Sequence, residues 1–128
     1  SSFQHLPIKF ITDDALKFVN REVRRQNKYD AIILDPPNYG RGPNGEKWEL
    51  FNHLPILLKF IPQILTPKPI FIIINSYAIR SSHLALHFAL NETMKEFSGK
   101  VESGELSIVE DQIDPRQINT AIFARWEQ

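Results

Sequence analysis

A carboxylate and two prolines follow an apolar run in the segment 29–42, which reads YDAIILDPPNYGRG. A proline has a fixed φ angle and no backbone N–H, so Pro36 and Pro37 hold one chain shape while their carbonyl oxygens stay free as acceptors. The Asp35 carboxylate and a proline carbonyl aimed at one point would accept both hydrogens of an amino group. The Tyr39 ring could stack on a flat base. The segment therefore predicts a site for a planar ring that bears an amino group. The alternative is an ordinary turn after a strand, because two prolines are common in turns.

The elements that must hold this site follow from the apolar pattern, which predicts strands alternating with helices and two adjacent strands at the end. The predicted strands are 8–11, 29–35, 70–78, 104–111 and 118–126, and the predicted helices are 15–27, 48–65 and 81–97. Such alternation is typical of an α/β fold in which helices cover a largely parallel sheet. We therefore expect one domain with a three-layer α/β sandwich.

Local signals refine three of these segments. The polar stretch 12–14 supplies cap residues for the first helix. In the second helix we expect a break at Asn52–Pro55, where the proline would open a new helix, and a kink or early end near Pro62. The glycine-rich segment 39–47 lacks the Gly-Lys-Ser/Thr of a nucleotide-binding P-loop. We expect it to form a mobile substrate loop.

Polar residues follow the carboxyl ends of the first three predicted strands. These ends are 12–14, 35–42 and 75–80. In open α/β sheets, ligands bind beyond the carboxyl ends of the strands. The pattern therefore predicts that these three segments converge on one ligand site.

The overall composition excludes several classes of protein. The chain has 128 residues, fifteen basic and fifteen acidic side chains, and no cysteine. Disulfides, thiolate metal sites and a cysteine nucleophile are therefore ruled out. No apolar run approaches the roughly 18 residues that a membrane span needs, and the N-terminal residues do not read as a secretory signal. A cytoplasmic location fits this composition.

Two clusters of charged or titratable residues carry weaker signals. A basic cluster early in the chain could attract phosphates, but it is more often the solvated face of a helix; its members are Lys17, Arg21, Arg24, Arg25 and Lys28. His83 and His87 have the i, i+4 spacing of some metal ligands. Because no acidic partner stands in the register of a zinc protease motif, we favour an ordinary helix and expect no metal.

The Asp-Pro-Pro-aromatic pattern at a strand end resembles motif IV of class I S-adenosylmethionine (SAM)-dependent methyltransferases. The segments FITDDALKFV, YDAIILDPPNYGRG, GEKWELFNHLPILL and INSYAIRSS are similar to the catalytic domain of bacterial large-subunit (23S) ribosomal RNA methyltransferases. The closing SGELSIVE and TAIFARWE resemble the final strand pair of relatives of those enzymes. The resemblance covers nearly the whole chain.

This resemblance implies a Rossmann-like α/β/α sandwich with the strand order 3-2-1-4-5-7-6, mostly parallel with an antiparallel strand near the C-terminal end. The chain begins at the third strand of that order, so the first two strands and their glycine-rich cofactor turn are absent from it. We therefore expect residues 1–128 to be one partial catalytic domain from the C-terminal part of a longer protein. It would hold about half of the SAM site and bind SAM weakly or not at all by itself.

The resemblance also implies roles for individual residues. The Asp14 carboxylate would accept a hydrogen bond from the adenine amino group of SAM, and the backbone N–H of Ala15 would donate one to adenine N1. Asp35, Pro36 and Pro37 would line the methyl-transfer site, with Asp35 also beside the cofactor, and Tyr39 would hold the target base. Substrate-binding positions would be Asn38, Arg41, Asn75, Tyr77 and Arg80, with the two arginines contacting RNA phosphates.

The implied reaction is methyl transfer to a base nitrogen of ribosomal RNA by direct in-line attack. Family members that methylate carbon 5 of cytosine use a cysteine nucleophile, which this chain lacks. Guanine N7 and an exocyclic amine both stay open as targets, and so does a glutamine side-chain nitrogen in a protein. A base within an RNA stem would have to be flipped out. The alternative is a non-catalytic RNA or protein interaction module derived from a truncated methyltransferase.

Overall fold

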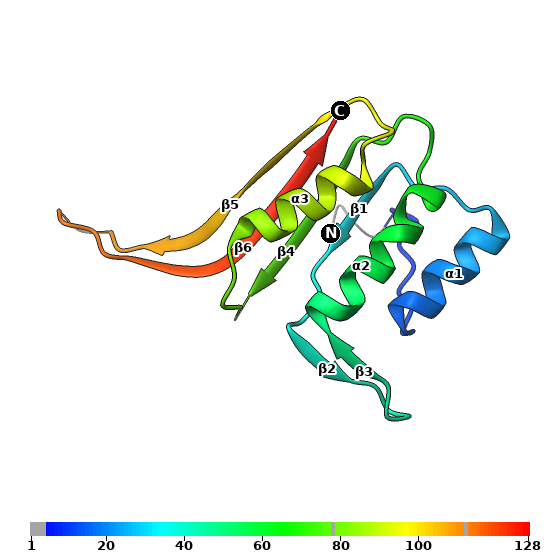
Figure 1. The fold of residues 1–128 in the computed structure, drawn as a ribbon, viewed down its shortest axis with the longest axis horizontal. Helices are drawn as coiled ribbons and strands as arrows, with labels where there is room; N and C mark the ends of the chain where they lie inside the picture. The colour runs from blue at the N-terminus through cyan, green and yellow to red at the C-terminus, as the bar shows by residue number, and fades with distance from the viewer. Residues whose placement is uncertain (1–4, 78, 112) are drawn as a thin grey trace.

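The computed structural model describes residues 5–77, 79–111 and 113–128 (Figure 1). In chain order, the elements of this described part are α1 (Ala15–Arg25), β1 (Ala31–Leu34), β2 (Tyr39–Arg41), β3 (Lys47–Glu49), α2 (Leu50–Phe60), the 3₁₀ helix η1 (Ile61–Ile64), β4 (Phe71–Tyr77), α3 (His83–Thr93), β5 (Lys100–Val109) and β6 (Gln117–Glu127). Every predicted helix and strand except 8–11 therefore has a counterpart.

A mixed four-stranded sheet with the order β1-β4-β6-β5 forms the centre of the described chain. The strands β1 and β4 pair in parallel, whereas β6 runs antiparallel to both β4 and β5. This order corresponds to the last four places, 4-5-7-6, of the strand order that the resemblance implies. The expectation of a mostly parallel sheet is wrong for the described residues, because one strand pair of this sheet is parallel and two are antiparallel.

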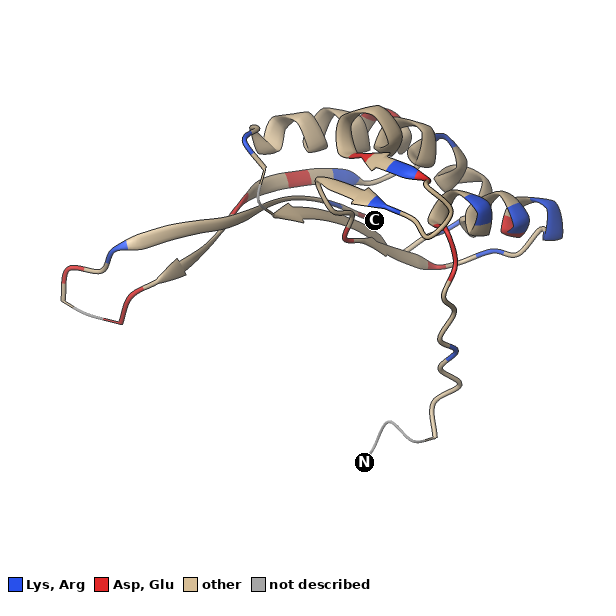
Figure 2. Ribbon diagram, turned by 90° about the horizontal axis from the view of Figure 1, so that it is seen from below, with Lys and Arg blue, Asp and Glu red and all other residues tan. Residues whose placement is uncertain are grey.

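The helices α1, α2 and α3 all lie on one face of this sheet, so the described residues form two layers (Figure 2). Alternation along β4 places Ile72 and Ile74 in the core beneath the helices, where Trp126 from β6 is also buried. On the opposite face the side chains are only partly covered, and Ile33 of β1 is 64% exposed. The predicted third layer is therefore not seen in the described part of the chain.

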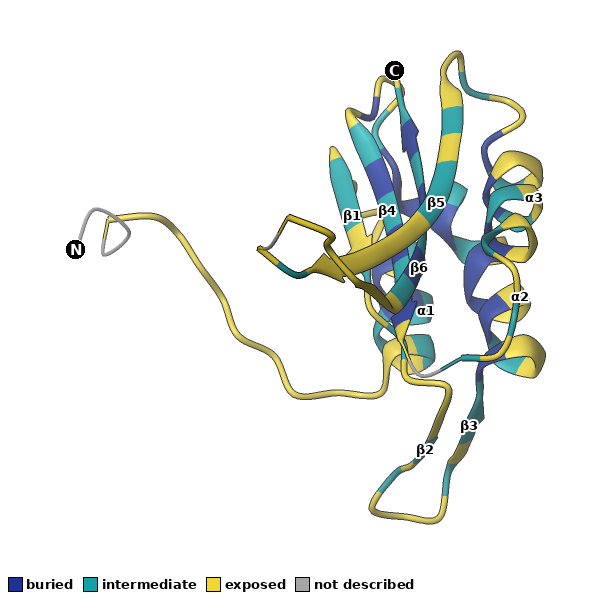
Figure 3. Ribbon diagram, turned by 90° about the vertical axis from the view of Figure 1, so that its left-hand side faces the viewer, coloured by how far each residue is buried: buried dark blue, intermediate teal, exposed yellow. Residues whose placement is uncertain are grey.

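The segment 8–11, predicted as a strand, belongs to no strand in the structure. It runs away from the sheet, and the Phe10 side chain is 93% exposed (Figure 3). A strand is held by hydrogen bonds to a neighbouring strand, and none of the described strands pairs with 8–11. The apolar pattern alone could not show this, because it does not reveal whether a partner strand is present.

Two further expectations fail between β1 and β4. The segment expected to be a mobile loop forms the antiparallel hairpin β2–β3, with Gly45 at a positive φ of 84° in its turn. The predicted break at Asn52–Pro55 is also wrong, because Pro55 lies inside the continuous helix α2. Pro55 costs α2 the one internal hydrogen bond that a backbone N–H at this position would donate to Phe51, and buried leucines fix this helix on the core. The expected end near Pro62 is confirmed, since α2 gives way to η1 at Ile61.

The helices α1 and α3 begin at side-chain caps, and the cap of α1 lies in the expected segment 12–14. The Asp14 carboxylate accepts a hydrogen bond from the backbone N–H of Lys17, and the Ser82 hydroxyl accepts one from Leu84. The helix α3 ends at Thr93, four residues before the predicted 97, because its last turn opens at Met94. Among the described residues, no helix has both the length and the apolar character needed to cross a membrane.

A buried carboxylate ties α1 to the chain that enters β1. Glu22 is 3% exposed, and its side chain accepts hydrogen bonds from the Tyr29 hydroxyl and from Asn27. These bonds hold the pKa of the Glu22 carboxyl below its usual value, with the tyrosine as the main cause. Burial and the bond to Glu22 raise the pKa of Tyr29 to about 12.

We predict that Tyr29→Phe lowers the free energy of unfolding by about 1 kcal/mol, since it removes one hydrogen bond to a buried carboxylate. Because the pKa of Glu22 is lowered in the folded state, the stabilisation is present above the ordinary carboxyl pKa and is lost as the pH falls through the lowered value. Urea denaturation at neutral and acid pH should therefore show the difference from wild type shrinking at acid pH. The control is Tyr39→Phe, whose ring is half exposed. An equal effect of both variants would contradict the account.

Candidate functional site

The end of β1 and the end of β4 meet at one corner of the sheet. The parallel register pairs Leu34 with Ile74, so the next residues along each strand, Asp35 and Asn75, lie side by side. The Asn75 side-chain amide donates a hydrogen bond of 2.7 Å to Asp35 Oδ1. The predicted convergence of these two strand ends is therefore present, and one carboxylate oxygen of Asp35 is oriented by a residue 40 positions later in the sequence.

The two prolines are braced from opposite sides. The Ser76 hydroxyl stands 3.5 Å from the Pro36 carbonyl oxygen, a long and weak contact that leaves this acceptor available. The Pro37 carbonyl instead accepts a hydrogen bond of 2.7 Å from the indole N–H of Trp48. Of the two proline carbonyls, only that of Pro36 thus remains suited to a ligand.

Trp48 belongs to β3, and the β2–β3 hairpin brings its ring back over the proline corner. Its ring stacks on His53 of α2, with 5.5 Å between the ring centroids. The Asn38 carbonyl accepts a hydrogen bond from the backbone N–H of Leu50, which starts α2. The hairpin therefore fixes the shape of the corner, a role that the composition of 39–47 did not reveal.

A cavity of about 250 Å³ joins this corner to the start of α1. Its lining is Ala15, Ile33, Leu34, Asp35, Pro36, Pro37, Trp48 and Leu57. It brings together Ala15, the predicted adenine contact, and the Asp-Pro-Pro motif. The Ala15 N–H is one of the free donors that every helix start presents. A neighbouring cavity of about 440 Å³ between α1 and β1 shares Ala15, Ile33, Leu34 and Leu57 with it.

Other predicted site residues lie outside this cavity. Asp14 stands next to Ala15, and one of its carboxylate oxygens caps α1. Tyr39 is half exposed on β2, where its hydroxyl accepts a hydrogen bond of 2.7 Å from Arg41 Nε. Tyr77 is exposed at the end of β4.

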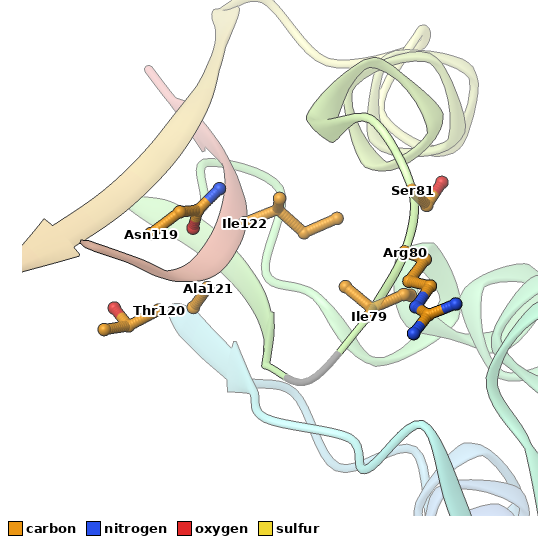
Figure 4. A pocket seen from close by; sticks show the side chains of 7 residues that line it. All are labelled: Ile79, Arg80, Ser81, Asn119, Thr120, Ala121 and Ile122. Atoms are coloured by element: carbon orange, nitrogen blue, oxygen red, sulfur yellow. The ribbon is translucent and has the colours of Figure 1, made fainter. Parts of the chain in front are cut away.

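Arg80 lines a separate cavity of about 460 Å³ beyond the end of β4 (Figure 4). The opposite wall is the start of β6, with Asn119, Thr120, Ala121 and Ile122. The sequence pattern pointed only to the carboxyl ends of strands, whereas Asn119 and Thr120 lie near the beginning of β6. Since β6 runs antiparallel to β4, its start lies at the same edge of the sheet.

The two histidines at i, i+4 contact the same side chain. His83 Nδ1 and His87 Nδ1 lie 2.8 Å and 2.9 Å from the Ser103 hydroxyl of β5. The described residues contain no group of three or more acidic, histidine or cysteine side chains placed to hold a metal. These histidines therefore join α3 to β5.

The chain matches no family model and no curated protein sequence. Among solved structures, a SAM-dependent methyltransferase from Agrobacterium tumefaciens shares 44% sequence identity over 98% of this chain, with a TM-score of 0.90. This chain is similar to a SAM-dependent methyltransferase in both sequence and fold. It spans 42% of the length of that protein.

Two more distant structures show the same α/β Rossmann-like fold. SMU.776, a putative methyltransferase crystallised with SAH, has a TM-score of 0.56 and 18% sequence identity to this chain. The match covers 90% of this chain and 30% of SMU.776. A precorrin-8w decarboxylase from Methanobacterium thermoautotrophicum has a TM-score of 0.54 and 15% sequence identity to this chain. The match covers 94% of this chain and 54% of the decarboxylase. Because a decarboxylase also has this fold, the fold by itself does not determine the reaction.

We predict that Trp48→Phe lowers the free energy of unfolding by about 1 kcal/mol, because it removes the hydrogen bond to Pro37 but keeps an aromatic ring beside His53. Urea denaturation followed by circular dichroism measures the change. The matched control is Trp126→Phe, which shrinks a side chain in the closed core and should cost more. A Trp48→Phe protein as stable as wild type would show that the indole bond does not brace the corner.

Proposed function

We propose that this chain is part of a SAM-dependent methyltransferase that transfers a methyl group to a base nitrogen of ribosomal RNA. One observation carries the proposal: a single cavity joins the Ala15 end of α1 to Asp35, Pro36 and Pro37 in a chain that is 44% identical to a SAM-dependent methyltransferase. Ala15 lies 20 positions before Asp35 in the sequence, and both residues line this cavity.

The residues of this cavity fit SAM in their donors and acceptors. The backbone N–H of Ala15 at the helix start would serve adenine N1, and the neighbouring Asp14 carboxylate would accept from the adenine amino group. Trp48 and Leu57 offer apolar surface to a flat ring. When bound, SAM supplies an electrophilic methyl group on a positively charged sulfur.

The chain's own part in the reaction is positioning. Asn75 fixes Asp35 Oδ1. The other carboxylate oxygen and the Pro36 carbonyl are left to accept hydrogen bonds from the amino group of the target base. Two directed hydrogen bonds fix the orientation of an amino-bearing ring, and a fixed near-attack geometry removes much of the entropic cost of in-line attack. A base nitrogen would supply its own lone pair to the methyl carbon while the methyl–sulfur bond breaks and SAH leaves; an exocyclic amine would also lose a proton. The chain would therefore need no cysteine nucleophile.

The rest of the cofactor site would come from a longer protein. The outer edge of β1 is unpaired among the described strands, and the sheet face that carries Ile33 has no helices over it. We propose that the missing strands pair with this edge and that further helices complete a three-layer sandwich there. The 128-residue chain alone would then bind SAM weakly or not at all.

RNA is the proposed acceptor because Arg41 and Arg80 stand near the corner without an acidic partner among the described residues. The arginine side chain recognises phosphate oxygens through its planar set of donors. Guanine N7 and an exocyclic amine remain alternative target atoms. The proposed location is the cytoplasm, where ribosomal RNA is modified in bacteria.

A second candidate function rests on the β5–β6 hairpin. Around the irregularity at Leu106/Ser107, its strands extend away from the sheet as an arm, whose described residues are 106–111 and 113–120 (Figure 1). The arm exposes Leu106, Ile108, Val109, Ile113 and Ile118. Acidic residues lie near its tip (Figure 2). Exposed apolar side chains beside acidic ones favour a protein partner, as in a protein interaction module or a methyltransferase that modifies a protein.

We predict that Asp35→Asn in the full-length protein lowers the rate of methyl transfer to RNA about 100-fold or more, a loss typical of removing one preorganised polar contact. Incorporation of labelled methyl groups from SAM measures the rate. The matched control is Asp30→Asn at the opposite end of β1, where the carboxylate binds Thr66. Unchanged methyl transfer by Asp35→Asn would remove Asp35 from the site.

A further inference from the structure

The cavity beyond β4 opens beside the proposed methyl-transfer site. Ile79, Arg80 and Ser81 form one wall and residues 119–122 form the other (Figure 4). In the β4–β6 register, Ile122 pairs with Ser76, whose hydroxyl faces Pro36, and Ala121 pairs with Tyr77. The cavity and the Asp35 corner therefore lie at the same edge of the sheet.

The distance between the two sites follows from the sheet order. Asp35 follows β1, and the cavity wall is formed by β6, two strands away with β4 between them. Adjacent strands lie about 4.8 Å apart, so the two sites are separated by about 10 Å.

The cavity presents hydrogen-bond donors and no carboxylate. The Arg80 guanidinium and the Asn119 amide make no hydrogen bond or ion pair with another described residue, and the Ser81 hydroxyl is likewise unused. By contrast, Arg21, Arg116 and Arg125 are each paired with an acidic side chain. The Thr120 hydroxyl donates a hydrogen bond to the Leu106 carbonyl, and the rest of the lining, Ile79, Ala121 and Ile122, is apolar.

This set of groups selects an anionic, oxygen-rich ligand. A guanidinium that is not neutralised by a carboxylate binds phosphate strongly, and amide and hydroxyl donors add directed hydrogen bonds. A basic peptide would find no acidic partner within the lining. A volume of about 460 Å³ lies within the range of small-ligand sites.

We propose that this cavity is a subsite for a phosphate of the RNA strand next to the target base, with Arg80 as its cation and Asn119 and Ser81 as further donors. The proposal rests on the proposed function, because it assigns the cavity to the acceptor of the same site. It adds a defined position for the RNA backbone, because a phosphate held in this cavity would fix a flipped-out base over Asp35.

The test compares two arginine variants of the full-length protein. Binding of a fluorescent single-stranded RNA oligonucleotide is measured by anisotropy at several salt concentrations, in the presence of S-adenosylhomocysteine. Arg80→Gln should weaken binding about tenfold and reduce the slope of log affinity against log salt by about 0.7, the value for one phosphate on a single strand. The matched control is Arg116→Gln, an exposed arginine on the arm paired with Glu110, which should leave both quantities unchanged.

A second variant separates the subsite from general electrostatics. Asn119→Ala should weaken RNA binding without changing the salt slope, because it removes a neutral donor. If Arg80→Gln behaves like Arg116→Gln, the subsite is overturned. If wild-type protein binds no RNA but methylates a protein, the acceptor is a protein and the subsite fails. Titration with SAM, run in parallel, tests the proposed function separately, since loss of the subsite leaves SAM binding intact.

Discussion

The parallel pairing of β1 with β4 is the interaction on which the rest of the site depends. It places two strand ends at the same level, so that Asn75 can donate to Asp35 and Ser76 can face the Pro36 carbonyl. A shift of one residue would turn these side chains to the opposite face of the sheet. The buried alternation of Ile72 and Ile74 against the helices opposes such a shift, so packing of the apolar core fixes the polar corner.

Around this pairing, each neighbouring element limits the motion of the corner from a different direction. The Trp48 indole holds Pro37 from the hairpin, and α2 follows directly from that hairpin and packs its leucines into the core. On the other side, Glu22 and Tyr29 tie α1 to the start of β1, which fixes where Ala15 stands relative to Asp35. The site is therefore built from rigid elements, which suits a reaction that depends on positioning.

Much of this framework could be predicted from local sequence signals. Apolar periodicity predicts the three helices and the four strands of the central sheet, and the segment 12–14 contains the residue that caps α1. The failures share one physical cause: they depend on partners distant in the sequence. The segment 8–11 has the composition of a strand but pairs with none of the described strands, and Pro55 is held within α2 by buried leucines. The hairpin depends on closer partners, since Gly40 pairs with Trp48 and the Trp48 indole donates to Pro37, and composition alone does not predict these contacts.

The residues of the candidate site could be predicted from the sequence, but the hydrogen bonds between them could not. The motif indicated Asp35 and both prolines, whereas the use of the Pro37 carbonyl by Trp48 depends on the tertiary fold. The cavity beside Arg80 could not be predicted, since Asn119 reaches it from an antiparallel strand. Similarity to a SAM-dependent methyltransferase over 98% of the chain agrees with the motif-based interpretation and leaves the acceptor to experiment.

The most direct measurement is calorimetric titration of SAM into the full-length protein and into the 128-residue chain. If the chain holds half of the SAM site, the full-length protein releases or absorbs heat with one site per molecule, and the isolated chain gives little or none. The absence of binding by the full-length protein would contradict the account, because a cavity that joins Ala15 to Asp35 would then have no methyl donor to hold.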